Sequence, residues 1–179
     1  MNGWKGRRRA SPSSGTADAP APGGKEKEEP SAYQRALGLL VRREHSRKEL
    51  VRKLSDRGIE RDQAEEALDT LERQQFQSDD RFASALARSR AAAGYGPVRI
   101  RAELGTHGMG RDIVEAALES CERDWNQSAC ELAIRRFGGK DLADRARRRK
   151  AVDFLLRRGF SQASALAAVK AVPGEFEPD

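Results

Sequence analysis

The chain has 179 residues, of which 35% are charged, 37% hydrophobic and 6% aromatic. So few apolar residues exclude a broad buried sheet and favour helices that each bury a narrow apolar stripe. No apolar run approaches the roughly 18 residues of a membrane span, and the first residues lack the apolar core of a signal peptide. We therefore expect an all-α, soluble, cytoplasmic protein that does not associate with membranes.

The net charge is +6 and the isoelectric point about 9.7, which suggest a polyanionic partner. The excess is concentrated near the C-terminal end, where residues 135–170 hold eleven basic and three acidic side chains. The rest of the chain is close to neutral, so the charge distribution indicates residues 135–170 as the region that would meet a polyanion.

The two ends of the chain differ in composition from its middle. Residues 1–30 contain four of the seven prolines together with Ser, Gly and mixed charges. They cannot bury enough apolar area to form a core, so a disordered tail is predicted. At the other end, Pro173 should stop the last helix and leave 172–179 as a frayed acidic terminus.

Three segments of the middle region align with one another without a gap. Each has an apolar pair four residues apart, then a glycine that stops the helix, then a hydrophobic residue. The glycines are Gly58, Gly108 and Gly159, at separations of 50 and 51 residues. A glycine just after a helix is typical of a C-terminal cap with positive φ. The apolar pairs and following hydrophobes are Leu50/Leu54 with Ile59, Ile100/Leu104 with Met109, and Ala151/Leu155 with Phe160.

This period predicts three tandem three-helix repeats, at 31–76, 77–123 and 124–171, that form an elongated, curved solenoid. The first helices should cover 33–43, 78–92 and 125–137, and the second helix of the last repeat should begin near Arg147. Cap signals agree with these boundaries. They are a capping box of Ser46 with Glu49, a first-turn Pro97, and the caps Ser78 and Ser161. The third helices should bury Ala64/Ala67/Leu68, Val114/Ala117/Leu118 and Ala165/Ala168/Val169.

The order and spacing of these motifs resemble the RecX family of RecA regulators over roughly 31–171. The residues that carry the resemblance are Arg43-x-x-Ser46-x-x-Glu49-Leu50-x-x-x-Leu54, Asp80-x-Phe82-Ala83, Gly96-x-x-x-Ile100-x-x-x-Leu104-x-x-x-Gly108, and Phe154-Leu155-x-Arg157-Arg158-Gly159-Phe160. The resemblance implies a protein without enzymatic activity that binds RecA filaments on single-stranded DNA. It also implies that the protein limits filament growth, ATP hydrolysis, strand exchange and co-protease activity in DNA repair and the SOS response. The long N-terminal tail departs from the family pattern.

The candidate contact residues for DNA or RecA form a basic face in or just before the second helices. They are Arg145, Arg147, Arg148, Arg149, Lys150, Arg157, Arg158, Arg99, Arg101, Arg47, Lys48 and Arg52. In the third repeat few acids compensate them, which favours contact with phosphates or an acidic partner. In the first repeat Glu44, Glu49 and Asp56 interleave with the cations, and an ordinary solvated surface is favoured there. Aromatic residues are too few for a base-stacking platform.

Little in the sequence favours an enzyme. His45 and His107 fall in different repeats without a neighbouring nucleophile, and surface or cap positions explain them. Cys121 and Cys130 form neither a disulfide framework nor a zinc-ligand cluster, so two reduced thiols on helices are expected. We expect no cofactor and no metal.

Three functional hypotheses remain open. The first is a RecX-like modulator, a monomer that lies in the groove of the RecA filament and contacts single-stranded DNA, and also duplex DNA, along its length. The second is a general nucleic-acid-binding helical repeat that acts only by competing for DNA. The third is a protein adaptor with an apolar groove, whose binding would depend little on salt, and the charge distribution disfavours it.

Overall fold

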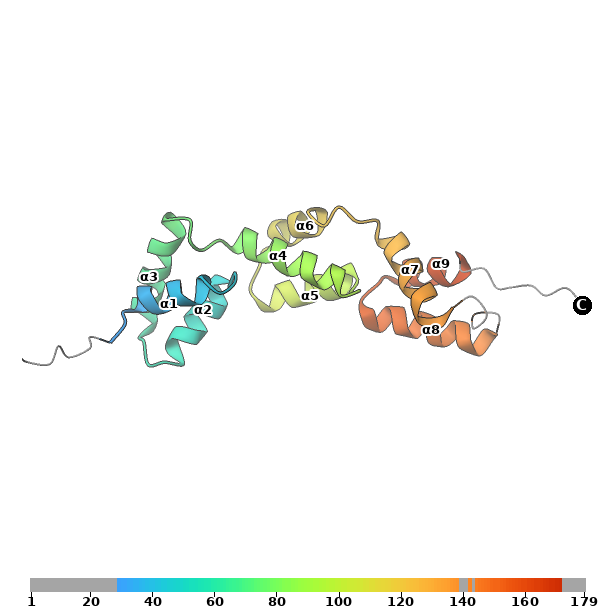
Figure 1. Cartoon of the computed structure of the whole chain (residues 1–179), viewed down its shortest axis with the longest axis horizontal. Coiled ribbons are helices and arrows are strands. Elements are labelled where there is room, and N and C mark those ends of the chain that lie inside the picture. Colours follow the sequence, from blue (N-terminus) through green and yellow to red (C-terminus); the bar gives the residue numbers. More distant parts are fainter. Residues whose placement is uncertain (1–28, 139–141, 143, 172–179) are drawn as a thin grey trace, which may run out of the picture.

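The computed structural model describes residues 29–138, 142 and 144–171, and this part of the chain contains nine α-helices and no strand. The helices are α1 (Ala32–Leu40), α2 (Arg47–Ser55), α3 (Arg61–Arg73), α4 (Asp79–Ala92), α5 (Pro97–Thr106), α6 (Arg111–Glu119), α7 (Trp125–Phe137), α8 (Arg145–Arg158) and α9 (Gln162–Ala171). They follow one another as three groups of three in a row, so the all-α repeat architecture is confirmed (Figure 1). The predicted N-terminal tail, apart from residues 29 and 30, and the frayed C-terminus lie outside the described residues.

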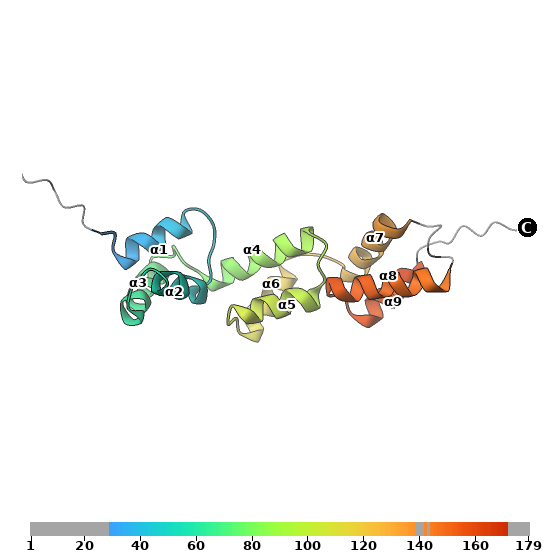
Figure 2. The same ribbon diagram turned by 90° about the horizontal axis from the view of Figure 1, so that it is seen from below.

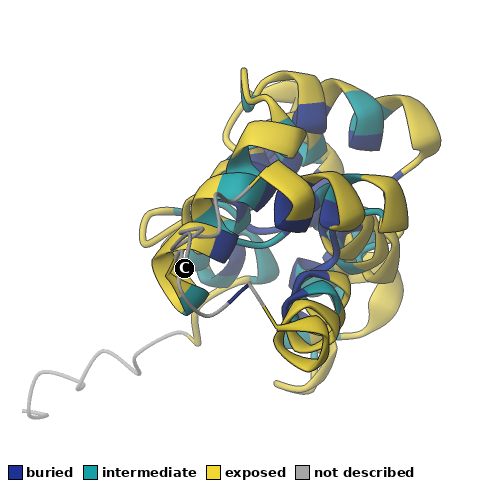
Figure 3. Cartoon of the chain, turned by 90° about the vertical axis from the view of Figure 1, so that its right-hand side faces the viewer, coloured by how far each residue is buried: buried dark blue, intermediate teal, exposed yellow. Residues whose placement is uncertain are grey.

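Each group of three helices has its own apolar core, in which the first helix packs against the third. In the first group Leu50, Leu54 and Leu68 are completely buried. The predicted apolar pairs and third-helix positions are buried in all three groups except Ala67, which is half-buried, while Leu71 is buried in the same helix. Of the hydrophobes that follow the glycines, Met109 and Phe160 are buried and Ile59 is half-buried. Seen along the long axis, the buried residues line the inner sides of the helices and the exposed residues the outside (Figure 3).

Most predicted helix boundaries agree with the structure. Ser78 caps α4 by accepting a hydrogen bond from the Arg81 amide, and Pro97 occupies the first turn of α5. Two boundaries differ. Helix α1 ends at Leu40 rather than at residue 43, and α8 begins two residues early because the Asp144 carboxylate caps it.

The glycines predicted to end the second helices have the expected backbone. Gly58, Gly108 and Gly159 have φ of 79°, 80° and 88°. Positive φ is unfavourable for residues with a Cβ, which explains why glycine stands at these three turns.

The three second helices, α2, α5 and α8, lie end to end in one row, which we call the second-helix column (Figures 1 and 2). Where α8 meets α5, the amides of Gly96 and Val98 donate to the carbonyls of Arg158 and Gly159 at 2.8 and 3.0 Å. The last carbonyls of α8 thus pair with the first free amides of α5, and the two helix dipoles align.

The close approach at this joint depends on the absence of side chains. A Cβ on Gly96 would collide with the Gly159 carbonyl, and one on Gly159 would collide with the backbone of Arg99. The second and third repeats therefore meet backbone to backbone.

The joint between the first and second repeats is polar. The Ser46 hydroxyl, which caps α2, lies 2.9 Å from His107 Nδ1 at the end of α5, and Lys48 Nζ donates to the Thr106 carbonyl at 2.8 Å. On the other side of α2, the Arg47 amide donates to Asp79 Oδ1 at 2.8 Å. Side-chain hydrogen bonds fix the relative placement of these two repeats.

The result is an elongated molecule with a shallow arch, as predicted (Figure 1). None of the described helices is long and apolar enough to cross a membrane.

Candidate nucleic-acid interface

The first repeat neutralises much of its own positive charge. Arg47 lies within 2.6 to 3.1 Å of three carboxylates of α3, those of Glu65, Asp69 and Glu72. Arg43 pairs with Glu49 at 2.6 Å. Arg47 is thus placed inside an acidic cluster of its own repeat, where its charge is compensated.

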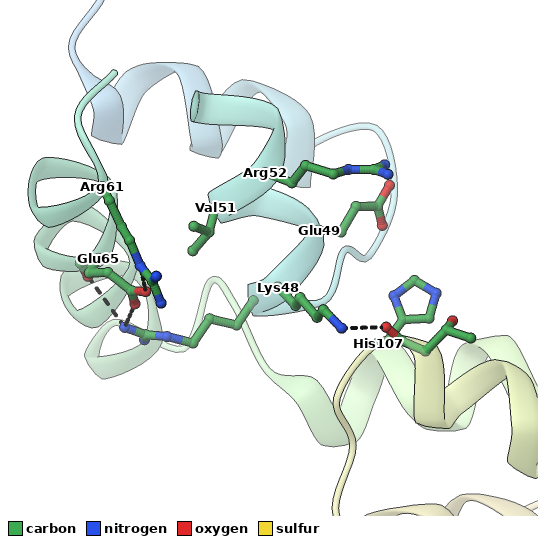
Figure 4. Close-up of a pocket in the computed structure, with 9 residues that line it drawn as sticks. Lys48, Glu49, Val51, Arg52, Arg61, Glu65 and His107 are labelled. Atoms are coloured by element: carbon green, nitrogen blue, oxygen red, sulfur yellow. Dashed lines mark hydrogen bonds and ion pairs between the residues drawn. The ribbon is translucent and has the colours of Figure 1, made fainter. Parts of the chain in front are cut away.

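A groove between the first and second repeats contains the remaining predicted cations of α2 (Figure 4). Lys48 points to the end of α5, where it binds the Thr106 carbonyl, and Arg52 is exposed without an ion pair to a described residue. Of the three cations predicted in α2, only Arg52 has no described partner.

The cations predicted in α5 have neighbours on the second repeat. Arg101 forms two hydrogen bonds of 2.8 Å to the Glu115 carboxylate, and these hold the pKa of Glu115 below its ordinary value. The guanidinium of Arg99 lies 4.6 Å from the centre of the Tyr95 ring and remains exposed. Arg99 keeps its charge available to a ligand, whereas the charge of Arg101 is compensated.

The basic residues of α8 are different because the helix has a single acidic residue, Asp153, against seven basic ones. The exposed members Arg145, Arg149, Lys150 and Arg157 form no ion pair with a described residue. Four adjacent cations, at residues 147–150, occupy the first two turns, where the helix dipole is positive. Repulsion among the exposed cations Arg145, Arg149 and Lys150 is unfavourable for the free protein and would be relieved by a bound polyanion.

Three other cations of α8 have contacts within the protein. Arg158 lies over the rings of Tyr95 and Phe154, at 5.1 and 5.3 Å, and donates to the Ala93 carbonyl at the joint of the second and third repeats. Arg148 donates to the Leu142 carbonyl at 2.6 Å, and Arg147 also has an intramolecular partner. The helix thus has cations with contacts inside the protein, of which Arg158 joins the second and third repeats, and cations that face solvent without an ion pair to a described residue.

The histidines and cysteines have structural surroundings. His45 is only 3% exposed, which differs from the predicted surface or cap position. His107 caps the end of α5 and packs its ring on Phe82, 4.7 Å away. Both thiols are free and partly exposed; Cys130 lies in α7, but Cys121 falls just after α6 rather than within a helix. Among the described residues, no group of three or more His, Cys, Asp or Glu could hold a metal ion.

Together these features define a class of protein, the tandem three-helix repeats, here with a strongly basic last unit. Comparison with known families then gives a specific assignment. The chain matches the descriptions "RecX, first three-helix domain" at 32–71, "RecX, second three-helix domain" at 78–118 and "RecX, third three-helix domain" at 122–169. The chain therefore belongs to the RecX family.

Individual relatives agree with this assignment. A regulatory protein RecX of Xanthomonas axonopodis pv. citri is 54% identical over 152 residues, which cover 84% of this chain and 94% of the relative. One from Stenotrophomonas maltophilia is 51% identical over 151 residues, or 84% and 90% of the two chains. A crystal structure of RecX from Lactobacillus salivarius shares the fold with a TM-score of 0.67 at 23% identity, covering 79% of this chain and 94% of that one.

Proposed function

We propose that this protein binds RecA filaments on single-stranded DNA and acts mainly as their inhibitor, limiting filament growth, ATP hydrolysis, strand exchange and co-protease activity in the cytoplasm. Membership in a family of regulatory proteins supports a regulatory rather than an enzymatic role. The observation that carries the DNA part of the proposal is the set of uncompensated cations on α8, Arg145, Arg149, Lys150 and Arg157.

The column of second helices suggests how the contact is made. A regular polyanion presents phosphates at a constant spacing, and a row of helices fixed end to end can follow it over several sites. The free cations on the column are most numerous on α8, whereas α5 and α2 each leave one, Arg99 and Arg52. We therefore assign the main phosphate contacts to the third repeat and supporting contacts to the other two.

The test is a variant in which Arg149, Lys150 and Arg157 are all replaced by alanine. Each phosphate contact to single-stranded DNA contributes about 0.7 to the slope of log K against log salt, so the slope should fall by roughly 2. Binding is measured by fluorescence anisotropy, with labelled oligothymidine alone and with the same oligonucleotide coated by RecA.

The matched control replaces Arg88, Arg111 and Arg123, which are exposed and outside the second-helix column, and so removes the same charge. Its salt slope should stay near that of the unmodified protein. Equal slopes for the two variants would contradict the assignment of the contact to α8. If the filament bound the α8 variant normally while bare DNA did not, the second hypothesis of simple DNA competition would be excluded.

A further inference from the structure

The third repeat has a groove between α8 and α9 that combines apolar and basic side chains. Val152, Leu166 and Val169 supply the apolar lining, and Leu166 is 44% exposed. Arg145, Arg149 and Lys170 are the cations beside it. The remaining lining residues are Asp144, Ala146 and Arg148.

The chemistry of this groove fits an anionic ligand that also carries an apolar group. Arg145, Arg149 and Lys170 form no ion pair with a described residue, and the exposed Leu166 lies among them. A nucleic-acid phosphate would satisfy the cations but would leave the apolar lining in water. An aromatic side chain between two carboxylates would satisfy both.

The chain itself carries such a sequence directly after α9. Phe176 stands between Glu175 and Glu177, and it is preceded by Pro173-Gly174, a typical turn sequence. Helix α9 ends at Ala171, one residue beyond the groove-lining Lys170. The segment therefore starts at the groove.

The length of the connection is sufficient. The five residues from Ala171 to Phe176 span at most about 17 Å when extended. Leu166 lies five residues back along α9, which is about 7.5 Å along a helix axis. Phe176 can thus reach Leu166 even after a turn.

We propose that residues 174–177 dock into the groove between α8 and α9. Phe176 packs against Leu166, and Glu175 and Glu177 pair with the cations beside it. The docked segment covers Arg149 and so competes with DNA for the third repeat. This last clause rests on the proposed function, whereas the docking itself does not.

Docking is tested on the free full-length protein by NMR, with Phe176→Ala, which changes no charge. The methyl signals of Val152, Leu166 and Val169 should shift relative to the unmodified protein, while those of Val41, 80% exposed in the first repeat, stay in place. Leu166→Ala should in turn shift the ring signals of Phe176. Groove methyl signals that do not respond to Phe176→Ala would overturn the proposal. Shifts that grow with protein concentration would instead show that the segment binds a second copy.

Competition is tested by the affinity for labelled oligothymidine. If the segment is docked in about two thirds of the molecules, its release raises the apparent affinity about threefold. Phe176→Ala should therefore bind about threefold more tightly, and Phe176→Leu, which keeps an apolar side chain, should stay near the unmodified protein. If docking is seen by NMR while both affinities are unchanged, docking stands and the competition clause is wrong. If neither the unmodified protein nor its variants bound DNA, the proposed function would be contradicted, and the NMR result on docking would still stand.

Discussion

At the scale of single residues, surroundings decide what a cation does more than its position in the sequence. Arg47 and Arg149 both lie in the first turns of second helices, yet Arg47 contacts three carboxylates of α3 and Arg149 none among the described residues. Helical periodicity could predict that both face away from the apolar stripe. It could not predict the acidic partners, because these come from another helix whose orientation depends on tertiary packing.

His45 is a second residue whose role depends on the fold. Its ring is almost completely buried, with Nδ1 3.1 Å from the Glu49 carboxylate, and Arg43 and Lys53 also pair with Glu49. Burial lowers the pKa of His45, an effect that Glu49 opposes only in part. Burial alone would raise the pKa of Glu49, but the hydrogen bonds from Arg43 and the close approach of His45 bring it below its ordinary value.

These shifts predict a loss of stability on acidification. Because the pKa of His45 is lower in the folded protein than in the unfolded chain, the unfolded chain binds more protons as the pH falls through the ordinary histidine pKa of about 6.5. The free energy of unfolding should therefore decrease between about pH 7.5 and about pH 5.5, and Glu49 adds to the loss at lower pH. Urea unfolding at a series of pH values measures this.

The control is His45→Gln, which cannot take up a proton. Its stability should vary less with pH over that interval than that of the unmodified protein, whatever its absolute value. A His107→Gln variant tests whether the effect belongs to His45. The same pH dependence in unmodified protein and His45→Gln would contradict the account.

At the scale of helices, the sequence was most informative where a local rule determines the outcome. Glycines at separations of 50 and 51 residues, caps such as Ser78 and the first-turn Pro97 each depend only on neighbouring backbone, and the predicted turns and starts agree with the structure. The joints between repeats could not be predicted in this way. They depend on contacts such as Ser46 with His107, which are 61 residues apart.

The joint between α8 and α5 gives a test of helix packing. Gly159 and Gly58 both have positive φ, but a Cβ at Gly58 would meet no atom within 4 Å, whereas one at Gly159 would collide with the Arg99 backbone. Gly58→Ala should cost about 1 kcal/mol for backbone strain alone. Gly159→Ala should cost about 2–4 kcal/mol, because overpacking adds to the same strain.

Equilibrium unfolding in urea compares the two variants, and circular dichroism shows whether helicity is retained. If the two substitutions cost the same, the second and third repeats would not meet backbone to backbone as described. A loss of stability seen only for Gly58→Ala would contradict the collision described at Gly159.

At the scale of the whole molecule, the arrangement converts small units into one long surface. Each repeat has a small core of its own, and the second helices of all three follow one another in the second-helix column, head to tail where α8 meets α5. The charge differs along this surface. Basic side chains of the first two repeats form ion pairs within their own repeats, whereas α8 carries exposed cations. Several weak contacts along a row of fixed helices add up to a useful affinity, which suits a filament better than a small ligand.

The most direct test of the central claim is ATP hydrolysis by RecA filaments formed beforehand on single-stranded DNA. The protein is titrated into these filaments with and without a large excess of duplex DNA as competitor. Regulation of the filament predicts inhibition at far less than one molecule per RecA monomer, and the inhibition should persist with the competitor. Inhibition that appears only when the protein saturates the DNA, and that the competitor abolishes, would contradict filament regulation and indicate simple competition for DNA.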